Sequence, residues 1–426
     1  MTMTTTLPTV ARRPATDLLG AELRADTLEG EELVATAERL AADFADGALA
    51  HDRDATFATE HLECLRAEGF LFGPVPHELG GGGVDSVHDV LVAMSRLARG
   101  DAATSIGVNM HFAVLLNLLR RWRVAAARGD SQQTEALGGA VEMITSAGIV
   151  FASAVSEPSP QDLTRPSTRA ERVEGGWRIN GRKIFATMAP AATMLNVGLS
   201  YTGEDGSERY GFAAVPVMAP GVEIPHDWDA LGMRASESGS VTFRDVLVGV
   251  DAVRGGFAAG EYSVTLLDRF LVSGAFHAAA SLGIAESAQQ RIVASLRGKV
   301  DATLDDPHAM MRLAENVVDL ASMRAVFDRA GRLIDEYHAA DPTGDASMAE
   351  VQAVYGEVQA AKTHINEAGS RVVDRALALS GGAGYMAAHP LAKAWRDARA
   401  GAFMHPLGAN RAYDYLARTA LGLEPR

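Results

Sequence analysis

The chain has 426 residues, of which 47% are hydrophobic and 22% are charged, and its formal net charge is −15. Because a domain usually holds roughly 100–200 residues, we expect two or three packed units. The acidic balance argues against nucleic acid as a partner, since binding a polyanion needs a basic surface, and the single cysteine, Cys64, excludes an intrachain disulfide.

The first part of the chain, residues 1–148, shows a helical repeat. Apolar side chains recur every three to four positions at Leu33, Ala37 and Leu40, which is the spacing of an amphipathic helix. Four consecutive glycines at 80–83 interrupt this pattern, because glycine is a poor helix former. We therefore predict an N-terminal helical domain over residues 1–148.

The chain shows no pattern of export or membrane insertion. Residues 1–12 lack an apolar run of signal-peptide length, and we find no run of about 18 apolar residues elsewhere. We expect a cytoplasmic protein without a membrane span.

The character of the sequence changes near Ile149. From there to residue 255, short runs rich in β-branched and aromatic residues alternate with turns. Asn180-Gly181 lies between two such runs, and this dipeptide is a strong hairpin signal, so we predict a hairpin turn there. The segment 149–255 is predicted to form a small central β-barrel domain.

The helical repeat returns in residues 256–426. Long amphipathic patterns cover 263–296, 309–340 and 348–380, and a shorter one lies near 407–421. Four helices of this kind predict a C-terminal four-helix bundle. The expected fold class is therefore α+β multidomain, with helices, then a β-barrel, then a helical bundle.

Five stretches between residues 74 and 399 resemble, in the same order, motifs of the acyl-CoA dehydrogenase superfamily. They are VPHELGGGGVD, SAVSEP, GWRINGRKIFAT, DALGMRASESGSVTFRDVLV and SGGAGYMAAHPLAKAWRDAR. Each stretch alone is a weak signal, whereas five in family order are specific. The resemblance implies bound FAD, a homotetramer, and an oxidoreductase that transfers hydride to flavin N5.

The resemblance also implies a cofactor site. The position of Ser156 offers a hydroxyl and backbone to the flavin, Thr187 lies by N5 and O4, and Phe185 replaces the family's tryptophan as the wall beside the ring. The backbone of a glycine turn approaches the FAD pyrophosphate from a neighbouring subunit, at Gly381, Gly382 and Gly384. Without the resemblance, these glycines would be read as a helix C-cap. No zinc, P-loop or Gly-x-Ser-x-Gly motif occurs, so we expect no metal site.

The chain departs from the family at the catalytic base. The family's dehydrogenases often carry a glutamate nine residues past the first arginine of Arg-Asp-x-Arg, and the same count from Arg396 reaches His405. Histidine can act as a base, because its unperturbed pKa is about 6.5, but it can equally be a packed side chain. Other members place a glutamate on the first bundle helix, where this chain has Asp268, followed by Arg269 in the position of the family's active-site arginine.

Three functions remain open from these residues. The first is α,β-dehydrogenation of an acyl thioester or related substrate, with Asp268 or His405 as the base that removes a proton. The alternative is a reduced-flavin monooxygenase on the same fold, which hydroxylates nitrogen, sulfur or carbon through a flavin hydroperoxide. Asp162 lies near the position of a serine in the family's CoA loop, and its charge would repel an anionic ligand, which favours this alternative. The third is a catalytically silent flavoprotein or assembly partner.

The expected partners follow from the same resemblance. They are FAD, or FMN for a monooxygenase, a small-molecule substrate that is a CoA thioester in the first hypothesis, and an electron-transfer flavoprotein or a flavin reductase. The homotetramer rests on the resemblance alone.

Overall fold

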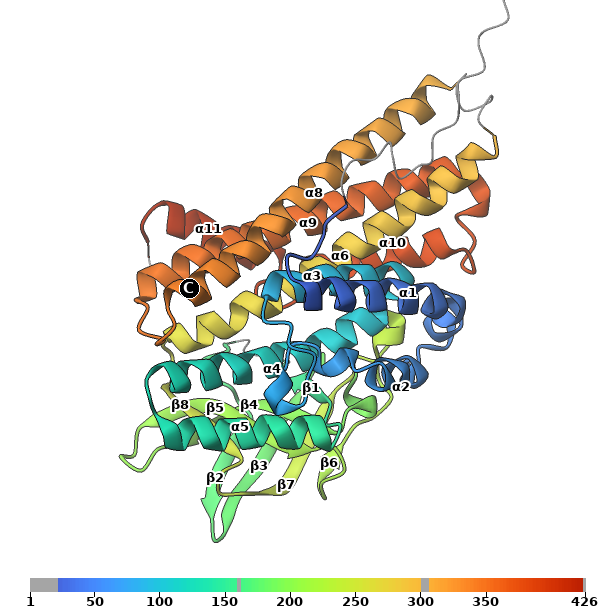
Figure 1. The fold of residues 1–426 in the computed structure, drawn as a ribbon. Helices are drawn as coiled ribbons and strands as arrows, with labels where there is room; N and C mark the ends of the chain where they lie inside the picture. Colours follow the sequence, from blue (N-terminus) through green and yellow to red (C-terminus); the bar gives the residue numbers. More distant parts are fainter. Residues whose placement is uncertain (1–21, 159–161, 300–305, 424–426) are drawn as a thin grey trace, which may run out of the picture.

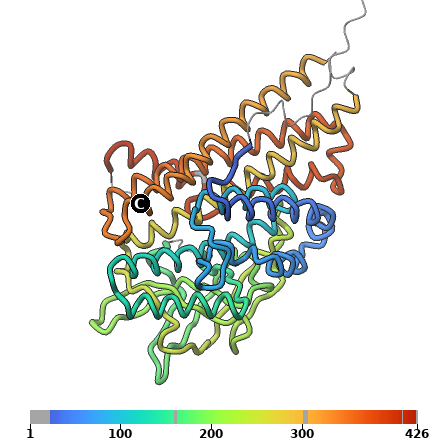
Figure 2. Tube along the Cα trace, viewed as in Figure 1, coloured from blue at the N-terminus to red at the C-terminus, as the bar shows by residue number. Residues whose placement is uncertain are grey.

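The computed structural model describes residues 22–158, 162–299 and 306–423. Figure 1 shows the strands on one side of the molecule, the N-terminal helices in the middle and the long C-terminal helices on the other side. Figure 2 shows that the chain passes from the N-terminal helices into the strands and from the strands into the helical bundle. The predicted order of helical domain, β domain and helical bundle is confirmed.

Side-chain caps define the starts of the N-terminal helices. The Thr27 hydroxyl accepts a hydrogen bond from the Gly30 N–H at the start of the first helix. The Asp101 carboxylate accepts from the N–H groups of Ala103 and Thr104 at the start of the fourth. These helices are α1 (Leu28–Asp54), α2 (Thr59–Ala67), α3 (Val87–Gly100), α4 (Ala102–Ala127) and α5 (Ser131–Ser146).

Helix α4 passes through the centre of the molecule. By length and composition it could cross a membrane, which we did not anticipate from the sequence, but 83% of its most apolar window is buried inside the fold. It is therefore a core helix. Its middle packs on the bundle, where the rings of Phe112 and Phe276 stack at 6.0 Å between centroids.

The β domain is one eight-stranded sheet with the strand order β6-β7-β3-β2-β4-β5-β8, and β1 pairs in parallel with β4. Apolar residues alternate along the central strand β4, where Leu195, Val197 and Leu199 are fully buried. The strands are β1 (Phe151–Ala154), β2 (Arg169–Val173), β3 (Gly176–Lys183), β4 (Met194–Thr202), β5 (Glu208–Pro216), β6 (Val222–Glu223), β7 (Val241–Gly249) and β8 (Val253–Ala258).

The predicted hairpin turn at Asn180-Gly181 is wrong. Both residues lie inside β3, at an irregularity in its pairing with β7, and the hairpin turn falls between β2 and β3 instead. Glycine is needed at 181 because a Cβ there would lie 2.5 Å from the Thr168 hydroxyl. The Asn180 side chain bonds Asp245 across the strands rather than its own turn.

The C-terminal part contains three long helices and two short ones. The short helix α11 corresponds to the predicted fourth bundle helix, whereas α10 was not predicted. The helices are α6 (Val264–Arg297), α8 (Pro307–Ala340), α9 (Met348–Ser380), α10 (Pro390–Ala400) and α11 (Ala409–Ala420). Glu286 of α6 is buried and joins the bundle to α3 through ion pairs with Arg96 and Arg99.

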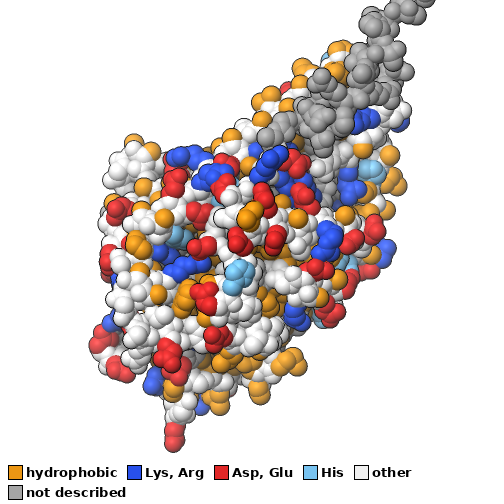
Figure 3. Space-filling model, viewed as in Figure 1, with side chains coloured by type: hydrophobic (Ala, Val, Ile, Leu, Met, Phe, Trp, Pro, Cys, Tyr) orange, Lys and Arg blue, Asp and Glu red, His pale blue; other side chains and the backbone are white. Residues whose placement is uncertain are grey.

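The charged side chains on the face shown in Figure 3 are intermixed. Acidic and basic groups alternate there without a continuous basic surface. This face therefore offers no site for a long polyanion.

Candidate functional site

The β domain brings Ser156 next to the 184–187 segment. The Ile184 N–H donates to the Ser156 carbonyl at 3.0 Å. Beside this bond, the Lys183 ammonium lies 2.7 Å from the Glu157 carboxylate, and both side chains are buried. This ion pair fixes the two segments against each other, so Ser156 and Thr187 belong to one wall.

Phe185 displays its ring at this wall. Its backbone is left-handed (φ 56°), which is uncommon for a residue other than glycine, and the side chain is 54% exposed. The ring meets the edge of Trp228 at 6.0 Å between centroids. An exposed aromatic side chain held by a strained backbone suggests a surface that another flat ring covers.

Hydroxyl groups line the same wall. Thr187 Oγ1 and Ser238 Oγ are 2.8 Å apart, and Ser238 Oγ is 2.7 Å from Ser236 Oγ. Sequence reasoning identified Thr187 and missed the two serines, although they lie in the motif ASESGS. An isoalloxazine has flat apolar faces and a polar edge, so the aromatic ring and hydroxyls of this wall fit a flavin.

The glycine turn at the end of α9 lies in the bundle and not at the wall formed by Ser156, Phe185 and Thr187. Gly381 has a left-handed φ of 66°, and a Cβ on Gly384 would lie 1.8 Å from the Ser380 hydroxyl, so both positions need glycine. Gly382 has open space around it. Figure 1 shows the α9–α10 turn at the end of the bundle opposite α11. A contact from these glycines to the cofactor therefore stays a prediction that involves a second chain.

His405 lies on the bundle side, in the loop before α11. Its ring is partly buried and meets the Phe270 ring edge-on at 4.9 Å between centroids. Burial holds the pKa of His405 well below its usual value, and the positive charges of Lys362, Arg269 and Arg411 and the nearby His277 lower it further. His405 is therefore a neutral imidazole at neutral pH.

Lys362 of α9 is a buried charged residue beside the His405 loop that sequence reasoning missed. Its buried ammonium donates to the carbonyls of Met404, His405 and Leu407 at 2.7, 3.1 and 2.9 Å. Burial alone lowers the pKa of Lys362 to about 7. The signal was present in the sequence, because a lysine interrupts the buried apolar face of the helix that ends near Ser380.

Asp268 and Arg269 are neighbours on α6 that face different parts of the molecule. The Asp268 carboxylate accepts from His338 Nε2 of α8 at 2.8 Å and lies 3.5 Å from Arg120 Nε of α4. The Arg269 guanidinium lies 3.7 Å from the ring centroid of Phe212 in β5. The structure thus turns Arg269 toward the β domain and holds Asp268 in an ion-pair network between helices.

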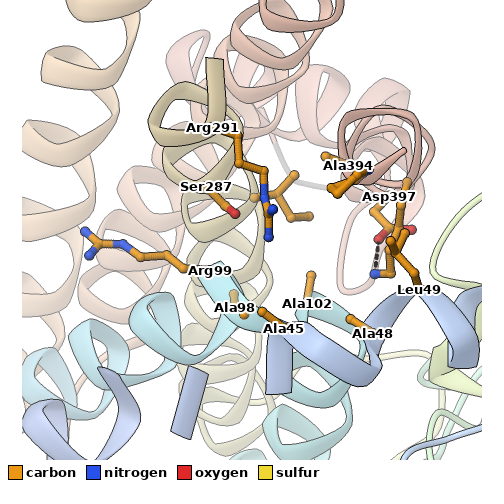
Figure 4. Close-up of a pocket in the computed structure, with 14 residues that line it drawn as sticks. Ala45, Ala48, Leu49, Ala98, Arg99, Ala102, Ser287, Arg291, Ala394 and Asp397 are labelled. Atoms are coloured by element: carbon orange, nitrogen blue, oxygen red, sulfur yellow. Dashed lines mark hydrogen bonds and ion pairs between the residues drawn. The ribbon is translucent and has the colours of Figure 1, made fainter. Parts of the chain in front are cut away.

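The Arg-Asp-x-Arg stretch on α10 is used for packing. Arg396 pairs with Asp52 of α1, and the Asp397 carboxylate accepts from the Met233 N–H at 2.6 Å and from the Lys393 ammonium at 2.7 Å. Figure 4 shows Asp397 at the edge of a small open pocket between α1, α3, α6 and α10. None of the predicted catalytic or cofactor residues lines this pocket.

One group of side chains within the described residues has metal-ligand spacing. Asp26, His88 and Asp89 offer ligand atoms within 4.8 Å of one another. Asp89 already accepts hydrogen bonds from the backbone of Asp26 and Thr27. These contacts anchor the start of α1, and we assign the group to that role.

Comparison with known proteins relates most of the chain to one family. Models of the acyl-CoA dehydrogenase N-terminal, middle and C-terminal domains match residues 27–127, 152–246 and 275–406. The chain is 32% identical to the amino sugar nitrososynthase RubN8 of Streptomyces rubradiris, over 93% of this chain and 91% of that protein. It is 32% identical to the L-evernosamine nitrososynthase of a Micromonospora species, over 91% and 88%.

Solved structures of flavin-binding proteins share the fold of this chain. KijD3 in complex with FMN and dTDP-3-amino-2,3,6-trideoxy-4-keto-3-methyl-D-glucose superposes with a TM-score of 0.83 at 30% identity, covering 94% of this chain and 96% of that one. The monooxygenase TdsC of Paenibacillus sp. A11-2, bound to FMN, has a TM-score of 0.79 at 21% identity, with coverage of 92% and 97%, and shares the fold.

Proposed function

Because this chain belongs to the acyl-CoA dehydrogenase family and is a flavin-dependent oxidoreductase, we propose that it is a monooxygenase that oxidises the amine nitrogen of an amino sugar. The amine gains one oxygen atom and becomes a hydroxylamine, and the second atom of O2 leaves as water. The two electrons come from a reduced flavin, FMN or FAD. This proposal selects the second function expected from the sequence over acyl-thioester dehydrogenation.

The observation that carries the proposal is the cationic surrounding of His405. Arg269, Lys362 and Arg411 all contribute positive charge there, and among the described residues no Asp or Glu forms an ion pair with Arg269, Lys362 or His405. Positive neighbours disfavour an ammonium ion, so an amine bound in this place loses its proton more readily. The free amine has the lone pair that N-oxidation needs.

The same surroundings argue against dehydrogenation. Removing an α-proton from an acyl thioester needs a base of suitable pKa in reach. His405 is a weak base because its pKa is well below the usual value. Asp268 is held by Arg120 and His338, in a network between α4, α6 and α8.

The remaining residues have positioning roles in this proposal. The wall of Ser156, Phe185 and Thr187 would hold the flavin by its polar edge and one face. A reduced flavin bound there supplies the electrons that activate O2. Lys362 fixes the backbone of the loop that carries His405, and the neutral His405 ring and Arg269 shape the place where the amine binds.

We also propose that the working form is a homotetramer supplied by a separate flavin reductase. Exposed apolar side chains near the glycine turn and the His405 loop support a subunit interface, because Tyr385 and Phe403 are more than four-fifths exposed. Light scattering of the purified protein measures the number of subunits.

A turnover assay tests the proposed function. Purified protein receives FMN or FAD, a flavin reductase, NADH and a dTDP-linked 3-amino sugar in air, and the matched control is the same nucleotide sugar with a hydroxyl in place of the amine. We expect oxygen consumption and a product heavier by one oxygen with the amine only. Anaerobic bleaching of the bound oxidised flavin by an acyl-CoA, without oxidation of the amine, would contradict the proposal.

A further inference from the structure

Three arginines gather where the end of α4, strands β5 and β8 and the start of α6 meet (Figure 1). The Arg269 guanidinium lies on the ring of Phe212 in β5. Phe212 is paired directly with Arg254 of β8, and directly paired residues of antiparallel strands project from the same face of a sheet. Arg254 and Arg269 are therefore neighbours across Phe212.

Arg121 completes the group from α4. Arg120 of α4 contacts Asp268 of α6. Arg121 and Arg269 are the next residues of these two helices, so they lie at the same height along α4 and α6. Burial lowers the pKa of Arg121 and the charge of Arg254 lowers it further. Burial likewise lowers the pKa of Arg269, to about 10, with a further contribution from Arg121. The charge of Arg121 is thus close enough to interact with the charges of both Arg254 and Arg269.

Arg121 and Arg269, which are half-buried, differ from the other enclosed arginines of the chain. Arg120 pairs with Asp268 and Asp341, and Arg96 and Arg99 share Glu286. In the part of the chain that the structure describes, no Asp or Glu forms an ion pair with the arginines of this group, which we call the arginine triad: Arg121, Arg254 and Arg269. Partly buried cations without a counter-ion are unfavourable unless a ligand supplies the negative charge.

We propose that the arginine triad binds the diphosphate of a nucleotide-linked substrate. Guanidinium groups suit this role because their planar forks form paired hydrogen bonds to phosphate oxygens. Arg269 joins the triad to the His405 region, since its charge acts on the His405 ring. A diphosphate held by the triad leaves the attached sugar facing the place assigned to the amine, so this inference rests on the proposed function and narrows its substrate to nucleotide sugars.

The carboxylate that we expected to repel an anion is engaged locally. Asp162 Oδ1 accepts hydrogen bonds from the Thr164 N–H at 2.9 Å and from its hydroxyl at 2.6 Å. Arg165 lies 4.0 Å from the same side chain. These contacts compensate part of its charge, so Asp162 does not oppose a diphosphate at the triad.

Calorimetric titration of the flavin-loaded protein with dTDP tests the proposal. Arg254→Gln is the main variant, because Arg254 is exposed on β8 and its replacement leaves the core intact. Arg121→Gln and Arg269→Lys follow, and the matched control is Arg244→Gln, an exposed arginine on β7 that pairs with Glu223. We expect Arg121→Gln and Arg254→Gln each to weaken dTDP binding roughly tenfold to a hundredfold, Arg269→Lys to weaken it less, and the control to stay within about twofold of the parent.

Competing probes separate this inference from the proposed function. Inorganic pyrophosphate should displace dTDP, and thymidine without phosphates should not. Unchanged dTDP affinity in all three triad variants, or equal binding of thymidine and dTDP, would each overturn the inference. If dTDP binding depends on the triad but no amine is oxidised, the proposed function fails and the diphosphate site stands.

Discussion

Two buried lysines, one in the β domain and one in the bundle, differ in whether a carboxylate neutralises their charge. In the β domain, Lys183 is fully buried and lies 2.7 Å from the Glu157 carboxylate, which also accepts from the N–H groups of Ser167 and Thr168. In the bundle, Lys362 is 2% exposed and contacts only carbonyl oxygens through its ammonium.

The difference separates a region whose buried lysine has a carboxylate partner from one whose buried lysine contacts carbonyl groups. Burial lowers the pKa of Lys183 to about 8 while Glu157 opposes this shift, whereas burial lowers the pKa of Lys362 to about 7 and no acidic group among the described residues opposes it. The β domain neutralises its buried charge and so provides a rigid wall. The bundle leaves positive charge uncompensated beside His405, and uncompensated charge is what acts on a bound ligand.

The largest expected effect comes from breaking the compensated pair. Glu157→Gln leaves the Lys183 charge buried without a counter-ion, and we expect a loss of roughly 3–5 kcal/mol in the free energy of unfolding. Lys362→Met should cost less, about 1–3 kcal/mol, because it removes hydrogen bonds but leaves no ion unpaired. Urea unfolding measures both, with the exposed Glu171→Gln of β2 as control; a smaller loss for Glu157→Gln than for Lys362→Met would reverse the comparison.

Glu157 and Lys362 each make stability rise with pH, but in different pH windows. Burial raises the pKa of Glu157, but Lys183 and two backbone N–H groups outweigh burial and lower this pKa to about 2. The ionised Glu157 therefore stabilises the fold above the unfolded pKa of about 4.3, and this stabilisation is lost as the pH falls toward 2. The pKa of Lys362 is also lowered, and the unfolded chain therefore binds more protons between about pH 7 and pH 10. Stability of the parent relative to Lys362→Met should rise across that second window.

A carboxylate introduced beside Lys362 and Arg269 should neutralise their charge, as Glu157 does for Lys183 in the β domain. His405→Glu restores the acid of the family's dehydrogenases and offsets the charges of Arg269 and Lys362, which favours the protonated amine. We expect the acidic limb of the pH profile of kcat/KM for amine oxidation to move up by about one unit, with roughly a tenfold loss at neutral pH. His405→Gln is the neutral control, and an identical profile for both variants would argue against the cationic mechanism.

The smallest effect is expected at the β wall. Thr187→Val removes one hydroxyl from the surface assigned to the flavin, and we expect flavin binding to weaken roughly fivefold to tenfold, about 1 kcal/mol. Quenching of flavin fluorescence measures this affinity. Thr202→Val, at an exposed position of β4, is the matched control and should leave the affinity unchanged.

Much of the β wall could be predicted from the sequence because its residues are close along the chain. Ser156 and Thr187 flank Glu157 and Lys183, and local strand geometry brings them together. The hairpin at Asn180-Gly181 was wrong because glycine served a close approach to Thr168 instead of a turn, a contact that spacing does not reveal.

The sequence by itself determined the family and the order of helices, sheet and bundle, and it predicts that His405 occupies the position of the family's catalytic acid. Only the tertiary structure decided which charges have partners. Asp268 is held by Arg120 and His338, whereas Arg269 and Lys362 form no ion pair with a carboxylate of the described residues. The physical reason is that the field at a buried group depends on side chains from distant helices, and neighbours along a helix such as Asp268 and Arg269 point to different surroundings.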